Sequence, residues 1–357
     1  MKRYAVLMAG GKGERFWPWS RSSLPKQFLN LTGEHSLVQQ TCQRIQGFFE
    51  PENILAVTGS EHETLIRRQL PQLPENNFII EPQGRNTAPC VGLAAMHIRR
   101  RDPDAVMLVF PADHMIKGQE DFLKCLERAL DLASSAENLV TIGIIPNRPE
   151  TGYGYIEREE EALPGKPPSF RVRRFVEKPD INRAVKYLQS GRYFWNSGIF
   201  AWKADVILEK IAKYIPRLYK GLADIEAHIG SRREEKAAKR IFPLLPSISI
   251  DYGVMEKEKG ILVVQGDFGW DDLGSWGALA EFFPKDQEQM LGRGEYVGID
   301  TADCFVYGQD ALIATLGVKG LVIVQSGDVV MVCSKERTQE VKTLVQSIKN
   351  RGLEKYL

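Results

Sequence analysis

The stretch Tyr4–Leu29 reads YAVLMAGGKGERFWPWSRSSLPKQFL. Its first five residues are a short apolar run, which is typical of a buried strand. The run ends in a glycine-rich turn, where glycine lets the backbone take positive φ angles and approach a ligand closely. Successive N–H groups in such a turn form a concave anion site. Because Arg15 and Lys26 follow closely, the stretch predicts a polyphosphate site.

Two common phosphate-binding loops do not fit this stretch. The Walker loop requires Ser or Thr directly after its lysine, but Lys12 is followed by Gly13. The dinucleotide fingerprint requires a third glycine where Phe16 stands, and Pro18 and Pro25 oppose a helix that runs straight on from the turn. A tight turn that carries surface charge is the simpler alternative, and this stretch alone leaves it open.

Composition places the chain among ordinary globular α/β proteins. Its 357 residues, 43% hydrophobic and 26% charged, allow a large domain and a smaller one. The net charge of +1 favours neither nucleic acid nor membrane binding. Five cysteines without C-x-x-C spacing argue against a disulfide framework or a zinc site. Since an apolar run begins at Tyr4 and no run is long enough for a bilayer, we expect no signal peptide and a cytoplasmic location.

Short apolar runs alternate with helix-spaced segments through the first half of the chain. Strands are expected at 4–8, 54–58, 78–80, 106–110 and 139–145, and helices at 36–48, 61–69, 90–100 and 121–133. This alternation predicts an α/β fold with a mixed, mostly parallel sheet covered on both faces. Ligands bind such sheets beyond the carboxyl ends of the strands. We therefore expect the glycine-rich turn and the loops after Ile80 and Phe110 at one edge of the sheet.

The loop after Ile80 reads EPQGRNTAP, residues 81–89. A turn and a helix capped by Thr87, with Pro89 in its first turn, explain part of it. They do not explain why Glu81 and Asn86 stand at the expected ligand edge. A guanine base offers hydrogen-bond donors at N1 and at its 2-amino group and an acceptor at O6, and a carboxylate with amide donors complements that set.

A carboxylate also follows the strand expected at 106–110. A turn or a helix cap would account for Asp113. However, Mg²⁺ in proteins binds one or two carboxylates together with phosphate oxygens and water. Asp113 is therefore a candidate magnesium ligand. His114 is a poor partner for so hard a cation, and we interpret it as structural or as a hydrogen-bond partner of the site.

The middle of the chain carries a second group of polar candidates. A strand expected at 172–176 ends in Glu177 and Lys178, which suit the hydroxyls and the phosphate of a sugar phosphate but also occur as plain surface pairs. Asn196 donates and accepts hydrogen bonds, which suits a hydroxyl. The polar segment Glu159–Pro168 predicts a mobile loop. Helices are expected at 204–213 and 217–228, and the charged run 232–240 predicts a solvated helix face.

From about residue 291 the pattern changes. Short β-like pieces at 296–299, 304–307, 311–316, 321–325 and 329–333 precede a charged helix expected at 338–349. Short strands at close spacing predict a small solenoid-like, β-rich domain. We therefore divide the chain into residues 1–285 and 286–357. The second part offers no obvious catalytic cluster.

Five separated motifs resemble, in the right order, those of the sugar-phosphate nucleotidylyltransferases. They are AGGKGER at 9–15 with Lys26, GRNTAP at 84–89, PADH at 111–114, VEKP at 176–179 and WDDLGSW at 270–276. The insert FWPWS at 16–20 resembles the mannose-1-phosphate guanylyltransferase branch. The resemblance implies transfer of GMP from GTP to mannose 1-phosphate, which gives GDP-mannose and pyrophosphate. It also implies a Rossmann-like nucleotidyltransferase domain followed by a left-handed β-helix-like domain.

The resemblance assigns roles to individual residues. It implies nucleotide contacts by Ala9, Gly10, Gly11, Lys12, Gly13, Glu81, Gly84, Asn86, Thr87 and Asp113. It implies sugar-phosphate contacts by Gly154, Glu177, Lys178, Asn196 and Asp251. Catalysis by charge neutralisation falls to Arg15, Lys26 and Lys178. By match to the W-x-D-x-G pattern Asp272 joins Asp113 as the second Mg²⁺ ligand, whereas Asp271 falls on the variable position.

The implied chemistry is an in-line attack by the sugar phosphate on the α-phosphorus of GTP. Because a phosphate is a competent nucleophile at neutral pH, no Ser, Cys or His base is needed. The resemblance further implies a homodimer through the C-terminal domain, and we do not expect the cupin-type isomerase domain of longer, bifunctional members. The alternatives are another hexose 1-phosphate, an adenine nucleotide, a catalytically silent sugar-nucleotide sensor and, more distantly, a nicotinamide dehydrogenase.

Overall fold

The structure, a computed structural model, describes residues 1–11, 13–283 and 289–357. These residues form two units, each built from separate stretches of chain. The first unit contains residues 1–10, 41–112 and 116–270, and the second contains 11–40, 113–115 and 271–357. The predicted boundary between 285 and 286 falls outside the described residues, so the division of the chain into 1–285 and 286–357 stays a prediction.

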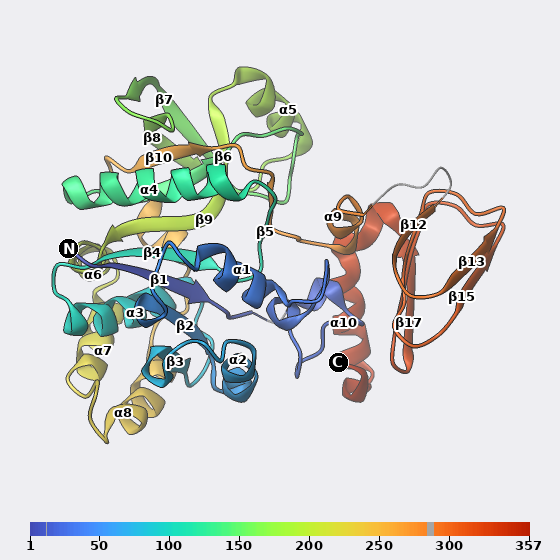
Figure 1. Cartoon of the computed structure of the whole chain (residues 1–357), viewed down its shortest axis with the longest axis horizontal. Coiled ribbons are helices and arrows are strands. Elements are labelled where there is room, and N and C mark those ends of the chain that lie inside the picture. The colour runs from blue at the N-terminus through green and yellow to red at the C-terminus, as the bar shows by residue number, and fades with distance from the viewer. Residues whose placement is uncertain (12, 284–288) are drawn as a thin grey trace. The chain divides into compact units, whose positions relative to one another are not determined.

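The first unit is built on a nine-stranded sheet in the order β3-β2-β1-β4-β9-β6-β10-β8-β7 (Figure 1). The strands are β1 (Arg3–Met8), β2 (Ile54–Gly59), β3 (Phe78–Glu81), β4 (Val106–Pro111), β6 (Val140–Ile144), β7 (Tyr155–Leu163), β8 (Ser169–Val176), β9 (Tyr193–Lys203) and β10 (Leu262–Gly266). Strand β1 runs parallel to β2 and β4, and β2 runs parallel to β3. Strand β9 is antiparallel to β4 and β6. The mixed sheet is confirmed, and its parallel part gathers the carboxyl ends of β1 to β4 at one edge.

Helices cover both faces of this sheet (Figure 1). They are α2 (Glu63–Gln69), α3 (Thr87–Arg101), α4 (Gln119–Ser135), α5 (Ile181–Ser190), α6 (Ala204–Tyr214), α7 (Pro216–Glu226) and α8 (Glu234–Ile241). Helices α3, α6 and α7 share one apolar core with Val109 of β4. On the next residue of that strand, Phe110 packs edge-on against Phe122 of α4, with ring centroids 6.3 Å apart. Because neighbouring strand residues point to opposite faces, α4 covers the other face.

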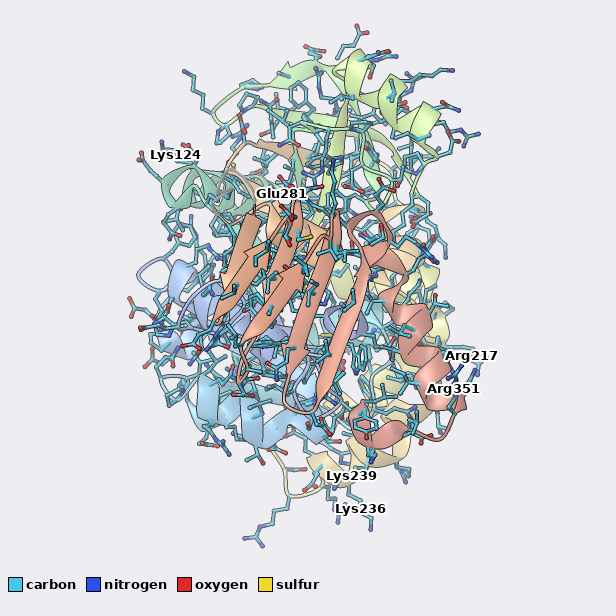
Figure 2. All side chains as sticks on the ribbon, turned by 90° about the vertical axis from the view of Figure 1, so that its right-hand side faces the viewer. Lys124, Arg217, Lys236, Lys239, Glu281 and Arg351 are labelled. Carbon is cyan, nitrogen blue, oxygen red and sulfur yellow. The ribbon has the colours of Figure 1, made fainter. Side chains whose placement is uncertain are left out.

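The second unit contains a coil of short, mostly parallel strands, of which the last, β17, runs antiparallel to β16. The strands are β12 (Gln289–Arg293), β13 (Tyr296–Ile299), β14 (Cys304–Tyr307), β15 (Ile313–Leu316), β16 (Leu321–Ser326) and β17 (Val329–Ser334). Strands β12, β14 and β16 pair in parallel in one sheet, and β13 and β15 pair in parallel in another. This alternation of two parallel sheets is the predicted solenoid-like arrangement, and Figure 2 views these strands face-on.

Aromatic residues from the start of the chain form the core of the second unit. Phe16, Trp17 and Trp19 are buried there with residues of α9 (Trp276–Ala280), of the strands and of α10 (Val341–Asn350). The ring of Trp19 packs edge-on against Tyr307 at 4.6 Å between centroids. The insert FWPWS therefore anchors the glycine-rich turn to the C-terminal strands. Helix α1 (Leu37–Ile45), β5 (Met115–Ile116) and β11 (Trp270–Asp271) lie where the chain passes between the two units.

The prediction of a loop at Glu159–Pro168 is confirmed for residues 164–168, which connect β7 to β8, but it is wrong for residues 159–163. Strand β7 continues to Leu163 and pairs with β8, where Ala162 lies opposite Phe170. The sequence predicted a loop because this part of β7 is exposed on both faces and carries glutamates, so it lacks an alternation of apolar and polar residues. A hairpin needs only its backbone pairing and a few cross-strand contacts, such as the 2.6 Å ion pair between Arg174 and Glu157. Helices α5 and α9 and strand β12 were also not expected.

In the part of the chain that the structure describes, no helix combines the length and the apolar character needed to cross a membrane.

Candidate functional site

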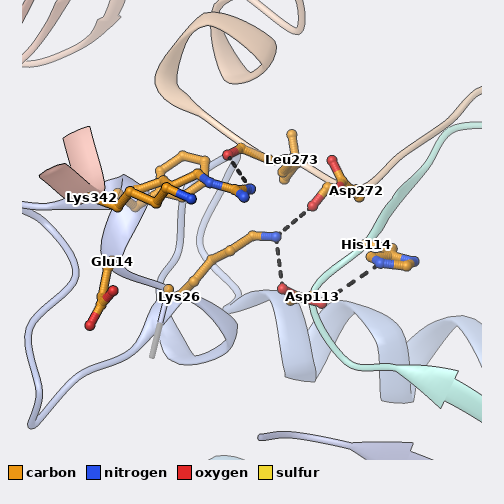
Figure 3. Close-up of a pocket in the computed structure, with 11 residues that line it drawn as sticks. Glu14, Lys26, Asp113, His114, Asp272, Leu273 and Lys342 are labelled. Carbon is orange, nitrogen blue, oxygen red and sulfur yellow. Dashed lines mark hydrogen bonds and ion pairs between the residues drawn. The ribbon is translucent and has the colours of Figure 1, made fainter. Parts of the chain in front are cut away.

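A pocket of about 460 Å³ in the second unit collects the predicted phosphate chemistry (Figure 3). Four stretches of chain far apart in the sequence build it, around residues 13–26, 113–114, 272–274 and 342. The predicted residues in its wall are Gly13, Arg15, Lys26, Asp113 and Asp272. The sequence analysis placed the two aspartates at one site although they lie far apart in the sequence, and the structure brings them together here.

Lys26 lies between the two aspartate segments. Its Nζ donates hydrogen bonds to Asp113 Oδ2 at 2.7 Å and to the backbone oxygen of Asp272 at 2.5 Å. Only 6% of Lys26 is exposed, whereas both of its partners are partly exposed. A Cβ at position 13 would lie 2.4 Å from the Lys26 Cβ, and Gly13 has a φ of 61°. Glycine is therefore required at position 13 by both the close approach and the backbone angle.

The Asp113 carboxyl group is ionised at neutral pH. Burial raises its pKa, but the nearby Lys26 ammonium, His114 and the hydrogen bond from Lys26 together hold the pKa below its usual value. His114 Nε2 lies 3.9 Å from Asp113 Oδ1. Figure 3 shows His114 on one side of the Asp113 carboxylate and Lys26 on the other.

Arg15 is held beside the Asp272 segment. It stands in a short 3-10 turn, Glu14–Phe16, and its Nη1 donates to the backbone oxygen of Gly274 at 3.3 Å. The preceding glycine-rich turn is fixed by Ser20 Oγ, which donates to the oxygen of Gly13 at 2.8 Å. A Cβ on Gly11 would meet nothing within 4 Å, although its φ of 105° itself favours glycine. The predicted nucleotide contact Lys12 lies outside the described residues.

The pocket offers a hard-cation donor set of two carboxylates. Within residues 1–11, 13–283 and 289–357, no group of three His, Cys, Asp or Glu side chains is arranged to hold a metal ion. A pair of carboxylates nevertheless fits a divalent cation that takes its other ligands from phosphate oxygens and water. Asp113 and Asp272 are such a pair, since both line the pocket.

The predicted sugar residues meet in the first unit. Asn196 Nδ2 donates to Asp251 Oδ1 at 2.8 Å, and the backbone N–H of Asn196 donates to the oxygen of Gly154 at 2.9 Å. Burial raises the pKa of Asp251, the hydrogen bond from Asn196 lowers it in part, and the charge of Glu177 raises it further. Lys178, the residue after Glu177, is exposed.

The residues predicted to contact the base also lie in the first unit. Glu81 ends β3, and only 5% of it is exposed. Its Oε1 has no hydrogen-bond partner among the described residues. Burial raises the pKa of Glu81 to about 8, with a hydrogen bond from Cys90 acting in the opposite direction and Glu61 adding to the rise. A buried carboxyl oxygen without a partner is suited to a ligand's hydrogen-bond donor.

The helix cap predicted at Thr87 is wrong by one residue. Asn86 caps α3, and its side-chain oxygen accepts from the N–H of Thr87 at 2.8 Å. Asn86 has a φ of 68° and a ψ of −175°, a combination that glycine adopts far more readily than a residue with a side chain, so the backbone is strained at this cap. Thr87 Oγ1 instead accepts from the N–H of Ile250 at 2.8 Å, next to Asp251. This bond ties the predicted base loop to the predicted sugar residues.

Three other predicted contacts are Ala9 and Gly10, which follow the first strand, and Gly84 in the base loop. The Ala9 N–H donates to the oxygen of Val57 at 2.8 Å, so this residue continues the edge where β1 and β2 end. A Cβ on Gly10 or Gly84 would meet nothing within 4 Å. Neither glycine is needed for space inside the protein, and a residue without a side chain leaves room for a ligand close to the backbone.

The sequence analysis missed one cation in the pocket wall. Lys342 lines the pocket from α10, in the part of the chain where no catalytic cluster was expected. Its own sequence neighbourhood resembles an ordinary amphipathic helix with exposed lysines. No local signal distinguishes it, because only the tertiary fold brings α10 beside Arg15.

Comparisons with known proteins agree with this geometry. The family model described as nucleotidyl transferase matches residues 4–289, and one described as the MannoseP isomerase/GMP-like beta-helix domain matches residues 294–348. A protein named mannose-1-phosphate guanylyltransferase from Klebsiella pneumoniae is 41% identical over 354 residues, which are 98% of this chain and 75% of that protein. A protein of the same name from Escherichia coli K12 is 39% identical over 360 residues, which are 98% of this chain and 74% of that protein.

A solved structure is also similar over nearly the whole chain. It is described as mannose-1-phosphate geranyltransferase from Thermus thermophilus, with a TM-score of 0.88 and 36% sequence identity. The match covers 98% of this chain and all of that one. The predicted fold, an α/β nucleotidyltransferase domain followed by a β-helix-like domain, is confirmed by the two family models. The chain therefore belongs to the nucleotidyl transferase family, and within that family it resembles the mannose-1-phosphate guanylyltransferases.

Proposed function

We propose that the protein is an enzyme that transfers GMP from GTP to mannose 1-phosphate and releases GDP-mannose and pyrophosphate. Relatives that match nearly the whole of this chain carry the name of this activity. The single structural observation that carries the proposal is the position of Lys26, whose ammonium is held between Asp113 and the Asp272 backbone in a pocket with Arg15. Fixed cations beside paired carboxylates are what a phosphoryl-type transfer requires.

The reaction is an in-line displacement at the α-phosphorus of GTP. An oxygen of the sugar phosphate forms a bond to that phosphorus, and the bond from the α-phosphorus to the oxygen that bridges to the β-phosphate breaks. The electron pair of the broken bond leaves with pyrophosphate. Lys178 holds the incoming phosphate, while Arg15 and Lys26 stabilise the charge on the α-phosphate and the leaving group. No protein base takes part, because the attacking phosphate is already ionised at neutral pH.

The family generally uses a divalent metal ion, and we propose Mg²⁺ here. Asp113 and Asp272 would hold it, because paired carboxylates leave coordination positions for phosphate oxygens and water. When bound, Mg²⁺ supplies positive charge next to the reacting phosphates. An ionised Asp113 at neutral pH is consistent with that role.

Recognition of the two substrates is proposed for two groups of residues in the first unit. Glu81, Gly84, Asn86 and Thr87 would bind the guanine base, where the buried Oε1 of Glu81 suits a donor on the base. The sugar would be held by Gly154, Glu177, Asn196 and Asp251, and the hydrogen bonds of Asn196 to Asp251 and to the backbone of Gly154 support this grouping.

We also propose that the protein is a cytoplasmic homodimer that needs neither nucleic acid nor a membrane. The C-terminal strands would form the interface. Strands β13, β15 and β17 and the turn before β15 expose apolar side chains, namely Val297, Ile299, Leu312, Leu316, Val330 and Val332. Such a group of exposed apolar side chains on one small unit suits an interface between two copies.

The test is pyrophosphate release with GTP and Mg²⁺ across a panel of hexose 1-phosphates. We expect strong, Mg²⁺-dependent release with mannose 1-phosphate and much weaker release with the glucose, fucose and heptose analogues. Release with another sugar alone would keep the mechanism and overturn the sugar assignment. Folded protein that binds GTP but releases no pyrophosphate with any sugar would instead be a sugar-nucleotide sensor.

A further inference from the structure

Lys342 brings an ammonium group from the C-terminal helix to the phosphate pocket. It is the second residue of α10 and lines the pocket together with Arg15 and Lys26. Figure 3 shows its side chain across the pocket from Asp113 and His114. None of the five sequence motifs that identify the family includes this residue.

The backbone that carries Lys342 is fixed by its neighbours. Val341 and Val345, one turn apart on α10, are buried in the core of the second unit, in the same cluster as Trp17. Helix α10 also packs against the 3-10 turn Glu14–Phe16, which carries Arg15. Because Lys342 follows the buried Val341 directly, its position relative to Arg15 is set by the core and not by the surface.

The charges of the pocket leave Lys342 available to a ligand. Lys26 is engaged by Asp113, and Arg15 donates to a backbone oxygen. Over residues 1–11, 13–283 and 289–357, the Lys342 ammonium has neither an ion pair nor a hydrogen bond.

Lys342 also decides the sign of the pocket's charge. The pocket is lined by three carboxylates, which belong to Glu14, Asp113 and Asp272. The positive charges of Arg15, Lys26 and Lys342 equal the three negative charges in number. A bound metal ion would therefore give the pocket a net positive charge before the nucleotide binds. Without Lys342 the protein groups alone would carry a net negative charge, which repels a triphosphate.

We propose that Lys342 binds the β- and γ-phosphates of the nucleoside triphosphate, the pair that leaves as pyrophosphate. The inference rests on the proposed function, which puts the reacting α-phosphate beside Lys26 and Asp113. The outer phosphates then extend away from Asp113, toward the side of the pocket where Lys342 lies. The C-terminal helix thereby takes part in substrate binding as well as in the fold.

The test compares nucleotide binding by the wild type and Lys342→Ala. Calorimetric titrations with GTP and with GMP, at fixed Mg²⁺, separate the outer phosphates from the rest of the nucleotide. We expect the variant to lose about tenfold in affinity for GTP, the size of one exposed charge-assisted contact, and to keep its affinity for GMP. In the reverse reaction the KM for pyrophosphate should rise by a similar factor, while kcat changes less. Lys342→Arg should restore most of both.

Lys349→Ala is the matched control, because it removes an exposed lysine two turns further along the same helix. It should bind GTP and GMP as the wild type does. Unchanged GTP affinity in Lys342→Ala would overturn the proposal, and so would an equal loss for GTP and GMP, which would indicate a disturbed fold. Since the titrations need no turnover, they remain decisive even if the wild type fails to produce GDP-mannose, an outcome that would refute the proposed function alone.

Discussion

Lys26 is the residue on which the proposed chemistry depends most. Its ammonium is buried and bonded to both aspartate segments of the pocket. We expect Lys26→Ala to lower kcat by about 10²–10³, the usual effect of removing one preorganised charge. Arg15→Ala should lower it by a similar factor. Steady-state pyrophosphate release, with circular dichroism to confirm the fold, measures both effects.

Replacing a lysine on the surface, away from the pocket, serves as the control for the loss of one positive charge. Lys124 on α4 is exposed and pairs with Glu120 and Asp121 (Figure 2). Exposed ion pairs of this kind contribute little. Lys124→Ala should therefore keep wild-type turnover, and near-normal turnover in Lys26→Ala would refute the role given to that residue.

The buried carboxyl group of Glu81 should make the free energy of unfolding depend on pH. Burial raises its pKa from 4.5 to about 8 in the folded protein, so the folded state keeps a proton that the unfolded state releases above pH 4.5. The stabilisation is complete below that pH, declines by up to about 1.4 kcal/mol per pH unit as the pH rises, and is lost above the folded pKa. Glu81→Gln keeps a neutral side chain at every pH, so it should not show this decline.

The measurement is the difference in unfolding free energy between Glu81→Gln and the wild type from pH 5 to pH 9. The contributions of other titrating groups cancel in that difference. The free energy of unfolding of the variant should rise relative to that of the wild type up to about pH 8 and then stay constant relative to it. Glu120→Gln, an exposed carboxylate on α4, should follow the wild type throughout. Parallel curves for Glu81→Gln and the wild type would mean that Glu81 is ionised in the folded protein.

Single residues also show what the sequence could and could not predict. Lys26 and Asp113 could be proposed from residue chemistry, as a cation close to a glycine-rich turn and a carboxylate after a buried strand, whereas Asp272 could be proposed only from its resemblance to the W-x-D-x-G pattern. The need for glycine at position 13 was predictable only as backbone freedom, whereas its close approach to Lys26 is a tertiary fact. Lys342 was not predictable, since an exposed lysine on an amphipathic helix carries no local signal of function.

At the scale of one element, the start of α3 offers a matched pair of variants. Asn86 caps this helix at a positive φ. Asn86→Ala loses the cap and keeps the backbone strain that Asn86 already bears, so we expect the free energy of unfolding to fall by about 0.5–2 kcal/mol. Asn86→Gly tolerates the angle and should cost only a few tenths of a kcal/mol. Urea unfolding measures the difference.

The same pair tests the proposed base contact. Both variants lack the Asn86 amide, so both should lose discrimination between GTP and ATP to the same extent despite their different stabilities. Full discrimination in Asn86→Gly would assign Asn86 to the helix cap alone.

The strands and helices that the sequence predicted are those with a buried face. Strand β1 and helix α4 were evident from their apolar spacing. The outer part of β7 was mistaken for a loop because exposed glutamates carry no alternation of apolar and polar residues. Helix α5 begins at an Asp180 cap whose carboxylate accepts from the N–H of Arg183 at 3.0 Å, but it buries only Ala184. Elements with so little buried area leave a weak periodic signal.

For the molecule as a whole, the proposed homodimer makes a testable prediction. Leu316 is 71% exposed at the end of β15. If the C-terminal strands form the interface, Leu316→Glu should convert the dimer to a monomer without changing the melting temperature at high dilution, because a buried charge opposes association. Leu244, which is 77% exposed in the first unit, provides the control Leu244→Glu, which should remain dimeric. Sedimentation velocity distinguishes the two, and a dimer in both variants would place the interface elsewhere.

The second unit consists of residues 11–40, 113–115 and 271–357. Because these stretches are far apart in the sequence, the unit cannot be completed until the last of them has been synthesised. Lys26 is made 246 residues before its partner Asp272, and Lys342, on the C-terminal helix, is made later still. Until those residues have been added, the nascent chain carries an incomplete phosphate pocket. A chain that stops before Lys342 should therefore be an inert fragment and not a weakened enzyme.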